Sequence, residues 1–391
     1  MALGAGQAAA GAQCWSAMKQ ECTKWKPRVL LTGTFLSVHG GSRSPIEDLA
    51  ERLTGAGHKC VCASSFRSGA ARTAHLLLTI AARRPSYDVA VVDLFSGNAF
   101  LWGEAAGALL RALRVPFVYA LHGGALPEFS ATRKRRVASC LARAAAVVAP
   151  SAYLLDRMQQ YRSDASLMPN PLSITEYPFR FRQPARPKIV WVRRFNQIYN
   201  PAMAPAVVAE LARRWPDVHL TMVGGDTGDG SLERTHQAAA NLGVTSRITF
   251  TGAVARDRVR EFLNQADVFL NTTDIDNTPL SVLEAMACGL CVVSTNPGGV
   301  PYLLRDGIDG LLVPCRDASA AAAAVDRVVS NPELARGLSA RGRAQAETFD
   351  WAHVLPQWER LLSGLGTRAS RPALGHGVGQ SSTGAQESAS R

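Results

Sequence analysis

Short apolar runs alternate with amphipathic runs along most of the chain. Residues 28–32 (RVLLT), 88–93 (DVAVVD) and 268–271 (VFLN) are rich in β-branched and apolar side chains, which predicts buried strands. Residues 45–55 and 256–266 instead place apolar side chains at helical spacing. This regular alternation predicts parallel sheets covered by helices on both faces.

The same reading extends to both halves of the chain. Strands are predicted at residues 28–32, 59–63, 88–93, 116–120, 146–149, 188–192, 219–223, 247–251, 268–271, 292–295 and 311–313. Helices are predicted at residues 45–55, 70–84, 105–114, 131–145, 152–161, 202–215, 231–243, 256–266, 280–286, 318–330, 332–347 and 351–365, with Ser151 as the cap of the helix at 152.

One segment interrupts the alternation. Residues 168–187 contain five prolines, at positions 169, 171, 178, 184 and 187, which predicts an extended linker. Because the alternation is complete on each side of it, we expect an α/β protein with two doubly wound domains that face each other across a cleft. Ligands of such sheets bind beyond the carboxyl ends of the strands. The boundaries are placed at residues 27–180 and 181–350, with flexible tails at 1–26 and 367–391.

The charge of the chain is uneven. Residues 1–187 contain 23 Lys and Arg against 11 Asp and Glu, whereas residues 188–391 contain 20 of each, so the net charge of +12 lies in the N-terminal half. The positive charge of this half suits binding to an anionic membrane, an acidic substrate or nucleic acid. The alternative is a solvated arginine surface without a partner. No apolar run approaches the roughly 20 residues of a membrane span, and residues 1–26 do not follow the order of a signal peptide. These features predict a cytoplasmic protein.

Two of the eight cysteines, Cys288 and Cys291, have CxxC spacing. A structural zinc site needs about four ligands, and there is no second pair or nearby histidine. The motif lies where a predicted helix ends and an apolar strand begins, so we expect two buried thiols.

The clearest indication of a functional site comes from residues 276–301, DNTPLSVLEAMACGLCVVSTNPGGVP. Pro279 suits the first turn of a helix, where the N–H groups of Leu280, Ser281 and Val282 form an anion site. Glu284, about one turn inside, can accept two hydrogen bonds from a ribose diol. Asp276 precedes the helix and can reach a second polyol. Ribose, diphosphate and sugar in a row describe a nucleotide sugar, although each acid taken alone also suits a helix dipole or a turn cap.

This stretch resembles the acid-x7-acid motif of retaining glycosyltransferases of family 4, which have the GT-B fold of two Rossmann-like domains. The resemblance covers roughly residues 27–365 and is most specific between about 190 and 315. It implies an acceptor-side N-terminal domain, a C-terminal domain that binds a nucleotide sugar, and a terminal helix at 351–366 that crosses back. The matching segments are EAMACG (284–289), VVSTN (292–296), GGVP (298–301) and DGIDGLLVP (306–314).

The resemblance also implies roles for individual residues. Glu284 would bind the donor ribose, and Asp276, where the family usually has Glu, would approach the transferred sugar. Arg193-Arg194-Phe195 resembles the family's Gly-Arg-Leu, so Arg194 would contact the diphosphate. The family's lysine about five residues later is replaced by Tyr199-Asn200, so one positive charge is missing or supplied from elsewhere. The remaining donor-binding residues would be Asn277, Thr278, Pro279, Leu280 and Ser281.

In the N-terminal half, Gly40-Gly41 resembles the family's glycine loop, which approaches the donor phosphates, but an ordinary turn is an equal alternative. His122, in His-Gly-Gly after a predicted strand, would lie near the scissile bond and the acceptor. The alternative is an ordinary surface or core histidine.

A basic cluster opens a predicted helix in the same half. It consists of Arg133, Lys134, Arg135 and Arg136, followed by an apolar face at Val137, Cys140 and Leu141. Such a helix either meets an anionic membrane surface or packs on the core with solvated arginines.

The interpretation is a metal-independent, cofactor-free retaining hexosyltransferase or related glycosyltransferase of polysaccharide biosynthesis, working in the cytoplasm or at the inner face of the plasma membrane. Its acceptor would be a glycan, a lipid-linked molecule or a small molecule. A nucleotide-sugar epimerase and a non-catalytic glycan- or nucleotide-binding protein are the alternatives. A nicotinamide dehydrogenase is disfavoured because no GxGxxG follows the first strand of either domain. Nucleic-acid binding is disfavoured because the basic half lacks interleaved aromatic residues.

Overall fold

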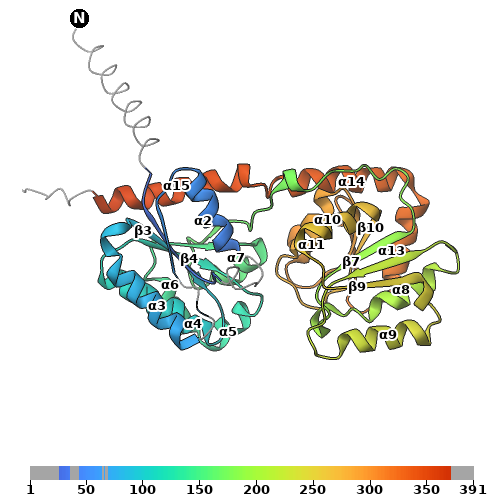
Figure 1. The fold of residues 1–391 in the computed structure, drawn as a ribbon, viewed down its shortest axis with the longest axis horizontal. Helices are drawn as coiled ribbons and strands as arrows, with labels where there is room; N and C mark the ends of the chain where they lie inside the picture. Colours follow the sequence, from blue (N-terminus) through green and yellow to red (C-terminus); the bar gives the residue numbers. More distant parts are fainter. Residues whose placement is uncertain (1–25, 36–43, 64–65, 67–68, 371–391) are drawn as a thin grey trace, which may run out of the picture.

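The strands form two parallel sheets, one in each half of the chain. The computed structural model describes residues 26–35, 44–63, 66 and 69–370. Each sheet has six strands, with the orders β2-β1-β3-β4-β5-β6 and β12-β11-β10-β7-β8-β9. Figure 1 shows the two domains side by side, with helices on both faces of each sheet. The predicted fold class, two doubly wound α/β domains, is confirmed.

The N-terminal domain begins at the first strand and ends before the linker. Its strands are β1 (Val29–Thr32), β2 (Cys60–Ala63), β3 (Val89–Leu94), β4 (Phe117–Leu121), β5 (Ala146–Ala149) and β6 (Ser166–Leu167). Its helices are α2 (Pro45–Gly55), α3 (Gly69–Ala82), α4 (Ala99–Ala112), α5 (Leu126–Thr132), α6 (Lys134–Leu141) and α7 (Ala152–Met158).

The C-terminal domain repeats the plan after the linker, which contains a short 3-10 turn at Ile174–Glu176. Its strands are β7 (Lys188–Val192), β8 (His219–Val223), β9 (Ile248–Gly252), β10 (Val268–Asn271), β11 (Cys291–Thr295) and β12 (Leu311–Val313). Its helices are α8 (Met203–Leu211), α9 (Ser231–Asn241), α10 (Arg256–Gln265), α11 (Leu280–Ala287), α12 (Val300–Leu303), α13 (Ala318–Ser330), α14 (Pro332–Glu347) and α15 (Trp351–Ser370).

The central strands are buried because both of their faces carry apolar side chains. Every residue of β1, β3, β4, β10 and β11 is buried. Continuous apolar runs of this kind are typical of parallel strands between two helical layers. The polar residues that follow these strands therefore gather at the carboxyl edge of each sheet.

Several predicted helices have different bounds in the structure, and two of the differences have a clear physical reason. The helix expected at 105–114 begins six residues earlier, at Ala99, because Phe100 and Gly103 belong to its buried face. A Cβ on Gly103 would lie 2.5 Å from a methyl of Leu94, so glycine permits close packing of α4 on β3. The helix expected at 131–145 is two helices, since the backbone of Arg133 (φ −132°, ψ 38°) breaks it between α5 and α6.

Helix α15 belongs to the C-terminal end of the chain but packs on the N-terminal domain, beside α2 (Figure 1). Trp351, Val354, Trp358 and Leu362 are buried in the same apolar cluster as the outer faces of β1 and β3. The chain therefore crosses between the domains twice, once in the linker and once before α15.

Cys288 and Cys291 are fully buried free thiols at the junction of α11 and β11. Burial raises the pKa of the Cys288 thiol to about 11 and that of Cys291 to about 12. The prediction of buried thiols is confirmed.

Candidate active site

Both candidate acids come from the segment between β10 and α11. Asp276 lies in the loop after β10, Pro279 has extended backbone at the N-cap position, and α11 begins at Leu280. The hydroxyls of Thr278 and Ser281 at this helix start are buried and have no hydrogen-bond partner within the described part of the chain. Buried polar groups are normally paired, so these two hydroxyls are candidates for contact with a ligand.

The backbone at the start of α11 differs in one respect from the prediction. The N–H of Val282 donates to the carbonyl of Pro279 at 3.0 Å. The expectation that Val282 contributes an open N–H is therefore wrong. Among the described residues, nothing accepts a hydrogen bond from the backbone N–H of Leu280 or Ser281. These two N–H groups and the positive end of the helix dipole are left for an anion.

The carboxylate of Asp276 is held from two sides. Its Oδ2 accepts a hydrogen bond from Nη2 of Arg193, and its Oδ1 accepts one of 2.8 Å from the backbone N–H of Asn277. Burial raises the pKa of Asp276 above its ordinary value, and the charge of Arg193 opposes that rise. Asp276 is thus a preorganised, largely buried carboxylate.

The turn after β11 packs against the backbone of the loop that carries Asp276. The N–H of Gly299 donates to the carbonyl of Asp276 at 3.0 Å. A Cβ on Gly299 would overlap the carbonyl of Asn277, and Gly298 has a φ of +53°. The glycine pair at 298–299 is therefore a packing requirement that fixes the loop carrying Asp276.

Glu284 lies one turn inside α11 and is also fixed by a hydrogen bond. The hydroxyl of Tyr177 donates to its Oε1 at 2.8 Å. Burial raises the pKa of Glu284, against the lowering effects of Tyr177, Arg256, Arg193 and Arg260 in that order. The carboxylate keeps acceptor capacity for a further ligand, since each of its oxygens has two lone pairs.

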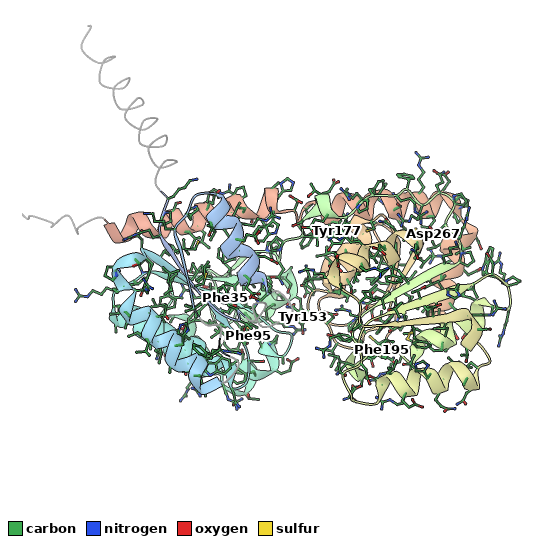
Figure 2. All side chains as sticks on the ribbon, viewed as in Figure 1. Phe35, Phe95, Tyr153, Tyr177, Phe195 and Asp267 are labelled. Carbon is green, nitrogen blue, oxygen red and sulfur yellow. The ribbon has the colours of Figure 1, made fainter. Side chains whose placement is uncertain are left out.

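Tyr177 was not among the residues predicted for the site. It is a buried residue of the linker, next to the 3-10 turn, and Figure 2 shows it at the junction of the two domains. The proline-rich composition of this segment indicated a linker and gave no signal for a contact with α11.

The neighbouring arginines Arg193 and Arg194 occupy different environments. Arg194, the residue expected to contact a diphosphate, is exposed and has no partner among the residues that the structure describes. Arg193 instead points to Asp276, and its guanidinium lies 4.8 Å from the ring centroid of Tyr199. The structure thus brings Arg193 to the acids, although the sequence reading assigned Arg194 to this site. The contact of Arg194 with a diphosphate stays a prediction.

In the N-terminal domain, His122 follows β4 and is oriented by an acid from the neighbouring strand. Its Nε2 lies 2.9 Å from Oδ1 of Asp93, which is nearly buried in β3. The ring of Phe95 stacks on the imidazole with centroids 5.0 Å apart. Asp93 ends an apolar strand at the ligand-binding edge, a signal that could have identified it from sequence.

The two domains meet at the loop that carries Asp276. The hydroxyl of Ser151 donates to Oδ1 of Asn277, and the Tyr302 hydroxyl lies 3.3 Å from a carboxylate oxygen of Asp156. Tyr153, which Figure 2 shows at the side of the N-terminal domain facing the other domain, packs edge-to-face against Tyr302. The predicted donor residue Asn277 is therefore a domain contact as well.

Two further predicted features have separate outcomes. Gly40-Gly41 lies outside the described residues. In the basic cluster, Arg133 lies over Phe129 and Arg136 pairs with Glu104 at 2.6 Å. Arg133 is the N-cap residue of α6, which begins at Lys134, so the cluster opens a helix as predicted. Its apolar face, Val137, Cys140 and Leu141, is buried in the domain core, which matches the core-facing alternative.

The described part of the chain contains neither a candidate metal cluster nor a candidate membrane span. Within residues 26–35, 44–63, 66 and 69–370, no group of three or more His, Cys, Asp and Glu side chains is placed to hold a metal ion. Over the same ranges, no helix combines the length and apolar character needed to cross a membrane.

Comparison with known proteins gives matches over both domains. The family model described as glycosyl transferases group 1 matches residues 174–345, and the model described as glycosyltransferase family 4 matches residues 39–176. A D-inositol 3-phosphate glycosyltransferase of Mycolicibacterium gilvum is 34% identical over 172 residues, 43% of this chain and only 37% of that relative. The protein of the same name from Nocardia farcinica is 28% identical over 310 residues, 72% of this chain and 68% of that relative.

Solved structures share the fold. Sucrose-phosphate synthase from Thermosynechococcus elongatus has a TM-score of 0.69 at 18% identity, covering 87% of this chain and all of that one. HepE of Anabaena in complex with UDP has a TM-score of 0.68 at 18% identity, covering 86% of this chain and all of that one. Two facing Rossmann-like domains define the GT-B fold, which this chain shares with these structures. The C-terminal domain thus matches the family described as glycosyl transferases group 1, and the N-terminal domain matches the family described as glycosyltransferase family 4.

Proposed function

We propose that this protein is a retaining glycosyltransferase that moves a hexosyl or related group from a nucleotide sugar to an acceptor. The observation that carries the proposal is the geometry around α11. Glu284 lies inside the helix, Asp276 lies before it, and two open N–H groups lie at its start. This order matches the ribose, the sugar and the diphosphate of a nucleotide sugar. HepE, a structural neighbour, was solved with UDP and with UDP-glucose.

The chain's own groups can perform the transfer by front-face displacement. Glu284 binds the ribose hydroxyls, while the N–H groups of Leu280 and Ser281 stabilise the diphosphate as it takes up charge. The bond from the anomeric carbon to the diphosphate oxygen breaks as the acceptor oxygen bonds to the same face of that carbon. The acceptor proton passes to the departing diphosphate oxygen. Asp276 and His122 position the transferred sugar and the acceptor.

The helix start and arginine side chains can supply the charge that a metal ion supplies in other sites, so we propose that transfer is independent of metal. Activity that is unchanged by EDTA would support this point. Activity that EDTA abolishes and Mg²⁺ or Mn²⁺ restores would contradict it.

The acceptor would bind at the carboxyl edge of the N-terminal sheet. Phe95, Trp102 and Asp93 line a hollow there of about 30 Å³, which is smaller than a sugar ring, so an acceptor would lie over these side chains and not inside the hollow. Aromatic rings and a carboxylate are suited to the faces and hydroxyls of a sugar or cyclitol. Several relatives carry the name D-inositol 3-phosphate glycosyltransferase, and that name makes a phosphorylated cyclitol a first acceptor to test beside glycans and lipid-linked acceptors.

Peripheral contact with an anionic membrane would rest on charge alone. Lys134 and Arg135 are exposed, whereas the apolar face of α6 is buried. Each exposed cation near such a surface contributes about 1 kcal/mol. Sedimentation with phosphatidylserine vesicles, compared between the wild type and a Lys134→Gln, Arg135→Gln variant, tests this part of the proposal.

The first experiment is calorimetric titration with UDP, GDP, ADP and CMP, in the wild type and in Glu284→Ala. Selective binding of one nucleotide that is lost in the variant supports the donor site. The anomeric configuration of the product, read by NMR, then tests retention. Conversion of the donor without an acceptor would favour an epimerase. Binding of none of the nucleotides would overturn the proposal.

A further inference from the structure

The site contains one cation that the resemblance does not assign. Arg193 stands where the family has glycine, and Tyr199 stands where it has lysine. In the structure these two residues contact each other, with the guanidinium 4.8 Å from the ring centroid. The positive charge that is absent at position 199 is therefore present a few ångströms away, on a different residue.

Arg193 contacts one of the two acids, and its charge also acts on the other. It is bonded to Asp276, and it is the one cation whose charge acts on both Asp276 and Glu284 within the described chain. A diphosphate joins the ribose, which Glu284 would bind, to the sugar near Asp276. We therefore expect the phosphates to lie near the guanidinium of Arg193.

The backbone of Arg193 is fixed by the sheet. Its N–H donates to the carbonyl of Val223 at 3.0 Å, which continues the pairing of β7 with β8. A Cβ on Gly224 would overlap the carbonyl of Arg193, so the neighbouring strand leaves no room for movement. A side chain on such a backbone is already positioned before a ligand binds.

The backbone of Tyr199 is also held by hydrogen bonding, so its ring has a defined position beneath the guanidinium. The carbonyl of Tyr199 accepts a hydrogen bond of 2.7 Å from the hydroxyl of Thr272. That hydroxyl in turn accepts one of 2.9 Å from the indole N–H of Trp191, a buried residue of β7. An arginine over a tyrosine face gains cation–π stabilisation and keeps its N–H groups free at the edge of the plane.

Three polar groups of the candidate donor site are buried and unpaired within the described chain. The Nε of Arg193 is buried and has no acceptor within the described chain, and the same is true of the buried Ser281 and Thr278 hydroxyls as donors. A salt bridge to Asp276 alone leaves Nε unsatisfied. The oxygens of a diphosphate are acceptors of the kind that such buried donors need.

We propose that Arg193, held against Tyr199, is the second diphosphate-binding cation of this site and replaces the charge that a lysine at position 199 would carry. Asp276 keeps the guanidinium in place until the diphosphate arrives and competes with it for the same cation. This inference rests on the proposed nucleotide-sugar function.

Titration with UDP and with UMP, or the pair with whichever base the wild type selects, tests the assignment. Arg193→Met should weaken UDP binding about 10- to 100-fold, the loss of one charge-assisted hydrogen bond, and UMP binding less than about threefold. Asp276→Asn should tighten UDP binding, because it removes a competing carboxylate. Tyr199→Lys in the Arg193→Met background should restore part of the UDP affinity. Arg258→Met removes an exposed arginine from α10 and serves as the matched control.

The outcomes separate the two proposals. Wild-type binding of UDP with no change in Arg193→Met, or with equal losses for UDP and UMP, would overturn the role of Arg193 alone. Small and equal effects of Arg193→Met and Asp276→Asn on UDP affinity would mean that the ion pair only shapes the loop. That result would also overturn the proposed role of Arg193. A wild type that binds no nucleotide would overturn both proposals. Thermal unfolding of each variant shows whether a loss reflects the fold.

Discussion

The hydroxyl of Tyr177 donates a 2.8 Å hydrogen bond to Oε1 of Glu284. The two residues are 107 positions apart, one in the linker between the domains and the other in α11. The linker thus reaches the wall of the candidate donor site, where it holds the carboxylate in one orientation. A change in the path of the linker would therefore alter the group proposed to bind ribose.

Tyr177→Phe should weaken nucleotide binding. The variant removes the hydrogen bond that lowers the pKa of Glu284 and orients its carboxylate. A net hydrogen bond is worth about 1 kcal/mol, so the dissociation constant should rise roughly fivefold, as measured by calorimetry.

Tyr87→Phe is the matched control. The Tyr87 hydroxyl donates to the Ile80 carbonyl at 2.6 Å, far from the site in the N-terminal domain. Both variants should lower the free energy of unfolding by roughly 1–3 kcal/mol, since each leaves a buried acceptor unpaired. Nucleotide affinity should fall only in Tyr177→Phe, and an equal fall in both would contradict a specific role for Tyr177.

Nucleotide affinity should also depend on pH through Glu284. Burial raises the pKa of this carboxyl above its ordinary value of 4.5. The folded protein therefore keeps the proton to a higher pH than the unfolded chain does, and the contribution of Glu284 to stability falls as the pH rises through the window above 4.5. Binding has the opposite sign, because the ribose hydroxyls need the ionised acceptor. Affinity is lost as the pH falls through the raised pKa.

The measurement is the dissociation constant of UDP between pH 4.5 and 8, in the wild type and in Glu284→Gln. The terminal phosphate of UDP titrates in both experiments. The difference between the pH profiles of the wild type and Glu284→Gln therefore reports the titration of the Glu284 carboxyl alone. A loss of up to about tenfold per pH unit at the acid end is expected for one linked proton. Superimposable profiles would show that Glu284 does not bind the nucleotide.

Much of the fold and part of the site could be predicted from the sequence. Buried parallel strands are continuous apolar runs, and the Asp276 and Glu284 chemistry lies in one contiguous segment whose spacing has a direct physical meaning. Tyr177, Arg193 and Asp93 were missed because their partners lie 107, 83 and 29 positions away. Only the folded sheets bring those pairs together. Helix α4 begins earlier than predicted, and its buried Gly103 packs closely on β3, a tertiary contact that the local pattern does not show.

Arg182 should be the strongest stabilising residue of the linker. It is fully buried, and its Nη2 donates to the carbonyls of Ala266 at 3.0 Å and Leu263 at 3.3 Å, while Asp267 lies 3.6 Å from its Nε. Burial lowers the pKa of Arg182 to about 10. Arg182→Met should lower the free energy of unfolding by about 3–5 kcal/mol, since it leaves buried acceptors and a carboxylate with one partner fewer.

Arg180→Met is the control in chemical denaturation. Arg180 also pairs with Asp267, but about half of its side chain is exposed, so its removal should cost about 1 kcal/mol or less. A similar loss in both variants would mean that burial of Arg182 contributes nothing beyond the ion pair. Nucleotide affinity should not change in either variant.

The Asp93–His122 pair should matter for transfer and little for donor binding. A carboxylate only accepts hydrogen bonds, so its contact with Nε2 places the proton on that nitrogen and leaves Nδ1 of the neutral ring as an acceptor. Asp93→Asn would present an amide that can donate instead, which favours the other tautomer. We expect kcat for transfer to fall about 10- to 100-fold, a loss typical of a misplaced positioning group, while the KM for the donor changes little.

If Asp93 acts only through the imidazole, His122→Ala and the double variant should show the same loss as each other, because the second change has nothing further to remove. Additive losses in the double variant would show that Asp93 contributes separately, and an unchanged kcat in Asp93→Asn would show that the orientation of His122 does not limit the reaction. Thermal unfolding of the three variants separates these effects from loss of fold, since Asp93 is nearly buried at the end of β3.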